Sequence, residues 1–339
     1  MHFKKIEITN FRNLRNVEIA LNPRVNVFFG ENAQGKTNLL ETIYTLTHGK
    51  SFRTSDVENL IHNVDKPAEF ARVTALIEKN KLQSRIYLVL SGHTKSFFVN
   101  EKKVSGNAIA RRFPSVLFSP ESLSVIKNSD KERRDLIDEL IESVFPEKVK
   151  IIDGYKRALK QRNKFLKDLR DGVLEVDAKN ALYLETLTES YLRVSAEMVQ
   201  LRLESLQALQ SDLEEALGYV LEADSVEIDV DYLISDQKVT STDPQFLYDT
   251  MRKRWLELKT AEIRSGHSLV GPHKHDVRII FAGKDSRFYC SQGQQRLLIL
   301  AFKMAQIRLH YRIQSLYPLL LLDDVLSEID EKKRMKLIE

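Results

Sequence analysis

The sequence predicts an α/β fold in which a phosphate-binding domain is interrupted by a helical segment. A glycine-rich octapeptide lies between strand-like and helix-like residues, and helical periodicity replaces the strand signals after about residue 121. Near the C-terminus, an apolar run ends in two carboxylates. We therefore expect an N-terminal part of the domain at 1–121, a helical insertion at 122–218 and a C-terminal part at 219–339.

The octapeptide at residues 30–37 fits the pattern G-x-x-x-x-G-K-[ST] at every fixed position. Residues 24–29 before it are strand-like, and a strand, a glycine loop and a helix N-terminus direct backbone N–H groups at an anion. We expect Lys36 to reach the β- and γ-phosphates of ATP and the Thr37 hydroxyl to ligate Mg²⁺. The other residues expected to bind the nucleotide are Gly30, Glu31, Asn32, Ala33, Gln34, Gly35 and Asn38.

Composition limits the class of protein. The chain has 339 residues, of which 42% are hydrophobic, enough for a large core or two domains. Its formal charge of +4 permits nucleic-acid binding but does not by itself indicate it. The single cysteine excludes an internal disulfide framework and fits a reducing compartment. No apolar run resembles a signal peptide or a membrane span, so we expect a soluble cytoplasmic protein.

The N-terminal part is rich in strand signals, and the insertion is rich in helix signals. Strands are predicted at residues 3–8, 17–21, 69–77, 84–90, 96–99, 103–104 and 115–118. Between 122 and 217 the apolar residues recur three and four positions apart, which is typical of packed helices. Asp171 and Gly172 interrupt this pattern and predict a turn between two antiparallel arms. Strand signals resume at 226–230.

Residues 319–324 read as a parallel strand that is buried and ends in acids. Asp323 is expected to hold Mg²⁺, and Asp324 to orient or deprotonate the attacking water. An apolar strand with a polar end is common, but its combination with a phosphate loop is informative. The long separation between Lys36 and Asp323 supports the inserted arm and indicates the ABC class of ATPases.

A second glycine-containing segment precedes an apolar helix predicted at 297–307. Residues 291–296 resemble the ABC signature, in which Ser291, Gly293 and Gln294 would bind the γ-phosphate held by the other protomer. Read alone, Ser291 is equally well explained as a helix N-cap. Residues 327–330 resemble the D-loop that follows the acid strand in this class.

Together these motifs resemble the RecF family of bacterial recombination and DNA-gap-repair ATPases, relatives of the SMC and Rad50 proteins. The resemblance covers nearly the whole chain and is also carried by residues 10–14, 51–54, 118–121, 271–273 and 322–328. It implies an ATP-driven homodimer that binds DNA near single-strand/double-strand junctions. Because Asp324 is one methylene shorter than the glutamate of most ABC ATPases, we also expect slow, DNA-stimulated ATP hydrolysis. It also implies loading of RecA together with RecR and RecO, and a role in DNA damage repair and the SOS response.

Three departures from the family pattern stand out. The family usually continues Gly-Pro-His with Arg-Asp-Asp, whereas this chain has Lys274, His275 and Asp276. No glutamine lies at 118–121, where ABC ATPases usually place a Mg²⁺-contacting one. The chain also stops nine residues after Asp330, so we expect a shortened C-terminus that weakens hydrolysis or dimerisation.

Two further features have alternative interpretations. Arg12 lies near the nucleotide motifs and is expected either to contact ATP or DNA or to pair with an acid. A basic helix is either a DNA-contacting face or a solvated one; its residues are Lys150, Lys156, Arg157, Lys160, Arg162, Lys164, Lys167 and Arg170. The main alternative function is a nucleotide-gated structural DNA clamp like SMC and Rad50, although an arm of about 95 residues folded back on itself is short for bridging.

Overall fold

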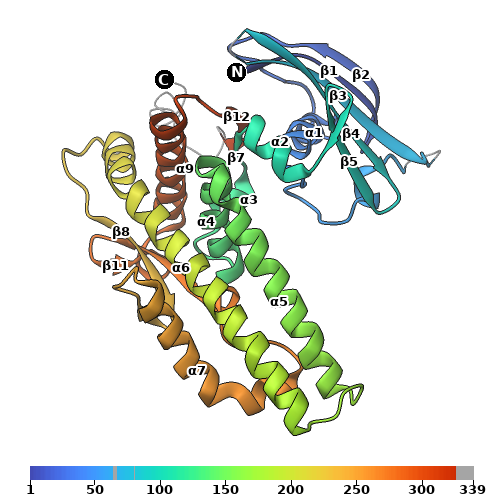
Figure 1. Cartoon of the computed structure of the whole chain (residues 1–339). Coiled ribbons are helices and arrows are strands. Elements are labelled where there is room, and N and C mark those ends of the chain that lie inside the picture. The colour runs from blue at the N-terminus through green and yellow to red at the C-terminus, as the bar shows by residue number, and fades with distance from the viewer. Residues whose placement is uncertain (64–66, 80, 326–339) are drawn as a thin grey trace. The chain divides into compact units, whose positions relative to one another are not determined.

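The computed structural model describes residues 1–63, 67–79 and 81–325, and these form two compact units (Figure 1). The first unit combines Met1–Ser122 with His310–Glu339, and the second is the continuous segment Leu123–Leu309. Residues 219–309 group with the second unit because their strands pack against helices within residues 130–221. Their assignment to the C-terminal part of the phosphate-binding domain stays a prediction.

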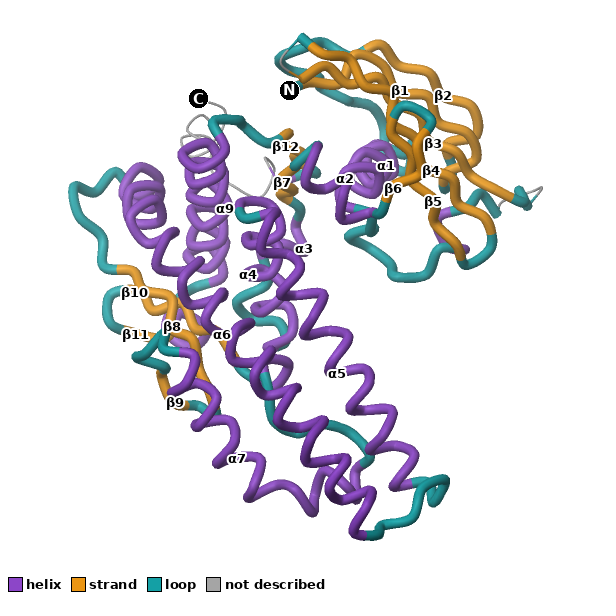
Figure 2. The backbone as a smooth tube through the Cα atoms, viewed as in Figure 1, coloured by secondary structure: helices purple, strands orange, loops and turns teal. Residues whose placement is uncertain are grey.

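The first unit is built around a six-stranded antiparallel sheet of order β2-β1-β3-β4-β5-β6 among the described residues (Figure 2). Its elements are β1 His2–Phe11, β2 Leu14–Ala20, α1 Lys36–His48, η1 Glu58–Leu60, β3 Phe70–Lys79, β4 Leu82–Ser91, β5 Thr94–Val99, β6 Lys102–Val104, α2 Gly106–Arg112, β7 Ser115–Phe118 and β12 Leu319–Leu322. Helices α3 Pro120–Leu123 and α9 Gln292–Gln314 contribute residues to both units.

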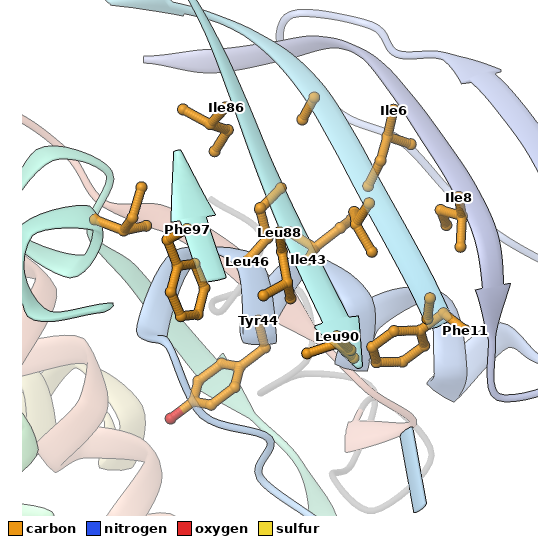
Figure 3. Close-up of a cluster of buried hydrophobic side chains, with 14 of the residues drawn as sticks. Ile6, Ile8, Phe11, Ile43, Tyr44, Leu46, Ile86, Leu88, Leu90 and Phe97 are labelled. Carbon is orange, nitrogen blue, oxygen red and sulfur yellow. The ribbon is translucent and has the colours of Figure 1, made fainter. Parts of the chain in front are cut away.

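One face of this sheet packs against α1, as Figure 3 shows. Alternate residues of β1 and β4, such as Ile6, Ile8 and Leu88, point into this core because successive side chains of a strand face opposite sides. Ile43 and Leu46 meet them from α1 and are also buried. Burial of each such aliphatic side chain contributes about 2 kcal/mol, so the core holds α1 against the sheet.

The predicted strand at residues 24–29 is wrong, because these residues form no strand in the structure. Val25, Val27 and Phe29 alternate as a strand would, yet all three are exposed, Phe29 by 92%. A strand persists only where a neighbour accepts and donates its backbone hydrogen bonds. Among the described residues no strand pairs with this segment, so alternation alone does not make it one.

The acid-ending strand is present as β12 and pairs in parallel with β7. Leu319 to Leu322 lie opposite Ser115 to Phe118, and the Asp323 amide donates to the Phe118 carbonyl at 2.9 Å. The predicted parallel strand is confirmed, but of its four leucines only Leu321 is buried. Pairing with β7 therefore fixes where Asp323 leaves the sheet.

The second unit combines long helices with a four-stranded antiparallel sheet of order β11-β10-β8-β9 among the described residues. Its elements are α4 Asp130–Val144, η2 Pro146–Lys148, α5 Val149–Arg170, α6 Ala178–Leu221, β8 Ile228–Ile234, β9 Gln237–Lys238, α7 Pro244–Ser265, η3 Pro272–Lys274, β10 Asp276–Phe281, β11 Lys284–Asp285 and α8 Ser286–Tyr289. No described helix is long and apolar enough to span a bilayer.

Helices α5 and α6 form the predicted antiparallel arm, and α7 packs against both (Figure 1). The turn falls where Asp171 and Gly172 predict it, with Gly172 at φ 72°. Helix α6 restarts at the N-cap Asp177, whose side chain accepts from the Asn180 amide. Apolar residues spaced three and four apart therefore build this arm, as the sequence predicts.

The basic residues of α5 divide between two faces of the helix. The lysines at 150, 156, 160, 164 and 167 and Arg157 are exposed, and no acidic residue of α5 is exposed with them. Arg162 is only 1% exposed and points the other way, so its inclusion in the basic face is wrong. It donates to Glu262, Ser268 and Thr188, and these partners compensate for the loss of solvent.

The loop at residues 268–275 is held by side chains from the surrounding helices. Glu262 accepts from the amides of Leu269 and Val270, and the Tyr191 hydroxyl donates to the Val270 carbonyl at 2.8 Å. A Cβ on Gly271, at φ 129°, would lie 1.9 Å from the Tyr191 hydroxyl oxygen. The loop can therefore pass this close to α6 only because residue 271 is glycine.

Two histidines of this loop have lowered pKa values: His275 is buried and His273 is partly buried. His273 lies between the Tyr155 hydroxyl, 2.9 Å from Nδ1, and the Ser268 carbonyl, 3.0 Å from Nε2. Burial lowers the pKa of His273 to about 4 and holds the pKa of His275 well below its usual value. Since the unfolded chain protonates both groups near pH 6.5, acid favours unfolding of this unit.

We expect the free energy of unfolding of the second unit to fall by about 2 kcal/mol through His273 between pH 7.5 and pH 5. The stabilisation is complete above pH 6.5 and is lost as the pH falls toward 4, since only the unfolded state gains the proton. Trp255, the single tryptophan, is buried in α7 and reports unfolding by fluorescence. His273→Gln should flatten this dependence, whereas His93→Gln, at an exposed position, should not; equal slopes would contradict the assignment.

Candidate nucleotide-binding site

The glycine-rich octapeptide leads directly into α1. Its backbone takes positive φ at Gly30 (150°), Ala33 (64°) and Gly35 (101°), which curls the loop back on itself. A Cβ at Gly35 would lie 2.7 Å from the Asn13 Oδ1 atom, so both the dihedral angle and the contact require glycine. The loop ends with its amides at the N-terminus of α1, the position at which helices bind anions.

Lys36, the first residue of α1, folds back over this loop. Its Nζ atom donates to the carbonyl oxygens of Gly30 and Glu31, each at 2.8 Å. The ammonium is therefore kept at the loop by two neutral acceptors rather than by a carboxylate. A charged phosphate oxygen is a stronger acceptor than a carbonyl, so this arrangement leaves the lysine able to transfer its hydrogen bonds to a phosphate.

Thr37 and Asp323, the two predicted metal ligands, meet in the structure. The Thr37 hydroxyl donates to the Asp323 Oδ1 atom at 2.9 Å, although the residues are 286 positions apart. Asp323 is buried, and the pairing of β12 with β7 holds its backbone. A hydroxyl and a carboxylate oxygen this close provide the hard oxygen donors that Mg²⁺ prefers.

Asp324, the predicted water-orienting acid, differs from its neighbour. It is exposed and takes a positive φ of 52°, so the chain turns sharply after the strand. The left-handed backbone at Asp324 therefore ends the extended conformation of the strand immediately after Asp323. The predicted D-loop at 327–330 lies outside the described residues.

A buried carboxylate that the sequence did not single out organises the other side of α1. Glu41 is fully buried and accepts from Arg12 with both oxygens, from Nε at 3.0 Å and from Nη2 at 2.8 Å. The Ser51 hydroxyl donates to the same carboxylate at 2.5 Å. Arg12 thus pairs with an acid, as one of its two interpretations proposes. The sequence carries one sign of this role: Glu41 lies one helical turn after Thr37, and residues four apart lie on the same face of a helix.

A chain of amides connects this cluster to the phosphate loop. Arg53 donates to Asn38 at 2.9 Å, and Asn38 donates to Asn13 at 2.8 Å. Asn13 in turn lies against Gly35. The segments 10–14 and 51–54, which carry part of the family resemblance, therefore gather around the first turns of α1.

The predicted signature lies in the second unit, at the N-terminus of α9. Ser291 and Gln294 form a reciprocal cap: the Gln294 side chain accepts from the Ser291 amide at 2.8 Å, and the Ser291 hydroxyl accepts from the Gln294 amide at 3.3 Å. Both residues and Gly293 are exposed. Ser291 is thus an N-cap, and the turn that carries it lies at the exposed N-terminus of α9, where an anion can approach.

The family model described as the RecF/RecN/SMC N terminal domain matches residues 2–339. The DNA replication and repair protein RecF of Lactobacillus acidophilus is 31% identical over all of this chain and 88% of its own length. The chain belongs to the RecF family. RecF of Oceanobacillus iheyensis is 32% identical and is covered over 90% of its length.

Solved structures agree with the membership in the RecF family. A structure of the recombination mediator protein RecF with ATP, in the RecFOR pathway, superposes with a TM-score of 0.88 at 29% identity, covering 99% of this chain and 88% of the other. An SMC head bound to the winged-helix domain of ScpA matches with a TM-score of 0.50 at 15% identity, over 100% and 85%, and shows the shared fold alone. The predicted ABC-type ATPase head is confirmed.

We expect Glu41→Gln to lower the free energy of unfolding of this RecF-family head by about 2 kcal/mol. The neutral amide presents donors to Arg12 and leaves its partly exposed guanidinium without a carboxylate partner, while Glu41 itself is fully buried. Urea unfolding monitored by circular dichroism measures the effect. Glu18→Gln, which makes the same chemical change at an exposed acid in the same unit, is the control. A loss no larger than that of the control would show that Glu41 does not organise the site.

Proposed function

We propose that the chain is an ATP-dependent DNA-binding protein of replication and recombinational repair that dimerises when it binds ATP. The observation that carries the proposal is the contact between Thr37 and Asp323, which joins the phosphate loop to the acid strand. Its RecF relatives are named as DNA replication and repair proteins, and one solved relative is described with ATP.

The phosphate-loop amides and Lys36 would bind the phosphates of ATP, and the hydroxyl of Thr37 and the carboxylate of Asp323 would hold Mg²⁺. When bound, Mg²⁺ neutralises charge on the phosphate oxygens. Asp324 is the proposed base for the attacking water. Because its side chain is one methylene shorter than that of glutamate, which most ABC ATPases carry there, we expect slow hydrolysis.

The exposed turn at the start of α9 is the proposed contact with a second copy. Ser291 and Gly293 face solvent at a helix N-terminus, and no nucleotide motif of the described second unit accompanies them. A phosphate oxygen is a stronger acceptor than the side-chain amide oxygen of Gln294, so a phosphate held elsewhere could replace it at the Ser291 amide. We infer that the γ-phosphate on one protomer bridges to Ser291 of its partner, so that ATP drives dimerisation.

DNA is the proposed polyanionic partner of the arm. The exposed face of α5 presents Lys156, Lys160, Lys164 and Lys167 at spacings of three and four, which places them in one row. Such a row neutralises consecutive phosphates without reading bases. With 22 residues, α5 spans only about 33 Å, which favours a compact DNA-binding head over a long bridging coil.

Partners follow from the relatives rather than from the geometry. Because a solved relative is placed in the RecFOR pathway, we propose that this chain acts with RecR and RecO in loading RecA at single-strand/double-strand junctions. The proposed ATP-bound dimer would be the form that they recognise.

We expect ATP with Mg²⁺ to shift the protein from monomer to dimer in analytical ultracentrifugation. Lys36→Met should weaken ATP binding at least ~10-fold and remove the shift, because a phosphate-facing cation is lost. Ser291→Arg should keep ATP binding but remove the shift, because it blocks only the partner's nucleotide. Dimerisation of both variants at the level of the parent would exclude the composite site.

We expect DNA affinity to fall steeply with salt and to change little with sequence. Replacing Lys160, Lys164 and Lys167 by Glu should reduce the slope of log affinity against log salt by about 3, since each phosphate contact contributes ~0.9. Fluorescence anisotropy on duplex and gapped DNA, with and without ATP, measures it.

The matched control for this triple variant makes the same charge change on α7 at Lys253, Arg254 and Arg264, which are exposed. Equal salt slopes for the two triple variants would show that DNA does not bind along this face of α5. If the DNA affinity of the parent and of both triple variants is the same with and without ATP, the hypothesis of a nucleotide-gated switch is wrong.

A further inference from the structure

The short turn that precedes Ser291 is fixed by ion pairs that the nucleotide motifs do not explain. Helix α8 and Cys290 connect β11 to the signature, and Arg287 lies in the middle of this segment. Its guanidinium donates to Asp276 through Nη1 at 2.9 Å and to Asp285 through Nη2 at 2.7 Å. The Asp285 side chain also accepts from the Arg287 amide at 3.0 Å.

Asp276 is the acceptor that connects this turn to the rest of the unit. Its Oδ2 atom accepts from Arg287, and its Oδ1 atom accepts from the Arg133 Nε atom at 2.8 Å. Arg133 is buried in α4 and also donates to the carbonyl oxygens of Ile126 and Asn128. Arg287 is thereby tied through one carboxylate to a helix that lies more than 140 positions earlier in the chain.

The position of Asp276 is itself fixed by the loop that precedes it. The Pro272 carbonyl accepts from Arg202 at 3.0 Å, and the His275 carbonyl accepts from Arg134. Both arginines are buried, and Arg202 is also paired bidentately with Asp138. Asp276 therefore begins β10 from a loop whose carbonyls are tied to α4 and α6.

The opposite side of the turn is held by Gln295, the fifth residue of the signature. This buried side chain donates through Nε2 to the carbonyl of Ser286 at 2.8 Å and to those of Arg287 and Cys290 at 3.3 Å. Ion pairs fix one side of the turn and a buried amide fixes the other. The backbone entering Ser291 consequently has little freedom.

The exposure of two aromatic side chains supports an imposed conformation. Phe288 and Tyr289 follow Arg287 and are 76% and 68% exposed. Large apolar side chains in a free turn would gain roughly 2 kcal/mol by collapsing onto nearby apolar surface. Instead, the Arg287 guanidinium lies over the Phe288 ring and the Lys284 ammonium over the Tyr289 ring, each 5.3 Å from the ring centroid, and both rings stay exposed close in sequence to Ser291.

We propose that Asp276 is a positioning residue: through Arg287 it holds the turn that presents Ser291 to the γ-phosphate carried by a second copy of this chain. This inference rests on the proposed function, because Ser291 needs positioning only if it binds a nucleotide in trans. It also gives a role to Asp276. This residue is the one carboxylate of the family pattern Arg-Asp-Asp that remains in the segment Lys274-His275-Asp276.

The test separates nucleotide binding from nucleotide-driven assembly. Asp276→Asn keeps the shape of the side chain but loses the charge that attracts Arg287. We expect its affinity for the nonhydrolysable analogue AMP-PNP to match the parent, since the phosphate loop is intact, while the dimer dissociation constant with AMP-PNP rises about 10-fold. Asp236→Asn, at an exposed acid paired with Arg278, is the matched control and should change neither.

A double-mutant cycle tests whether Asp276 acts through Arg287. Arg287→Gln alone should weaken dimerisation to a similar extent, and the double variant should be no weaker than the worse single variant. Additive losses would overturn the proposal, because they would mean that the two residues act independently. Trp255 fluorescence checks folding. If Asp276→Asn is unfolded, the comparison of Arg287→Gln with Arg254→Gln, at an exposed arginine of α7 that pairs with Glu257, decides the question.

Ser291→Arg distinguishes failure of the proposed ATP-driven dimer from failure of the positioning role of Asp276. If AMP-PNP dimerises the parent but not Ser291→Arg, the composite site stands, and parent-like dimerisation of folded Asp276→Asn and Arg287→Gln then overturns the positioning role alone. If AMP-PNP does not dimerise the parent, the proposed function fails and this inference fails with it.

Discussion

The hydrogen bond between Thr37 and Asp323 is the contact on which the candidate ATP site depends. It joins the two ends of an interrupted domain, and it places a hydroxyl and a carboxylate where a divalent ion needs both. Two constraints make the contact possible: α1 is held against the sheet by its buried face, and β12 is held by β7. Loss of either constraint would separate the phosphate loop from its acid without changing a residue of either motif.

Local pattern was enough to predict most elements of this RecF-family chain and the central pair of its site. The glycine loop, the arm with its turn at Gly172 and the acid after β12 each have a signal within a few residues. Residues 24–29 show where such a signal stops being sufficient. Their alternation resembles that of β1, but β1 has partners on both sides and this segment has none among the described residues. Strand formation depends on a neighbour that the segment itself does not encode.

The burial of individual charged side chains was the feature of the structure that the sequence predicted least well. Arg162 has the same helical setting as the lysines around it, and only its partners Glu262, Ser268 and Thr188, distant in sequence, determine that it points inward. Glu41 is the equivalent case beside the phosphate loop, because its burial depends on Arg12 and Ser51. Burial of a charge requires compensating groups from elsewhere in the chain, and a linear pattern does not show them.

The pairing of β7 with β12 also has a consequence for the order in which the protein is made. Leu123–Leu309 is continuous, so that unit has all of its residues while synthesis is still under way. The residues of β7 are synthesised some 200 residues before those of β12, their parallel partner. At a synthesis rate of 5–20 residues per second, this delay lasts about 10–40 s. During this interval the sheet of the first unit can form, while the acid half of the site is still missing. ATP binding with Mg²⁺ coordination would therefore be among the last properties that a newly made chain acquires.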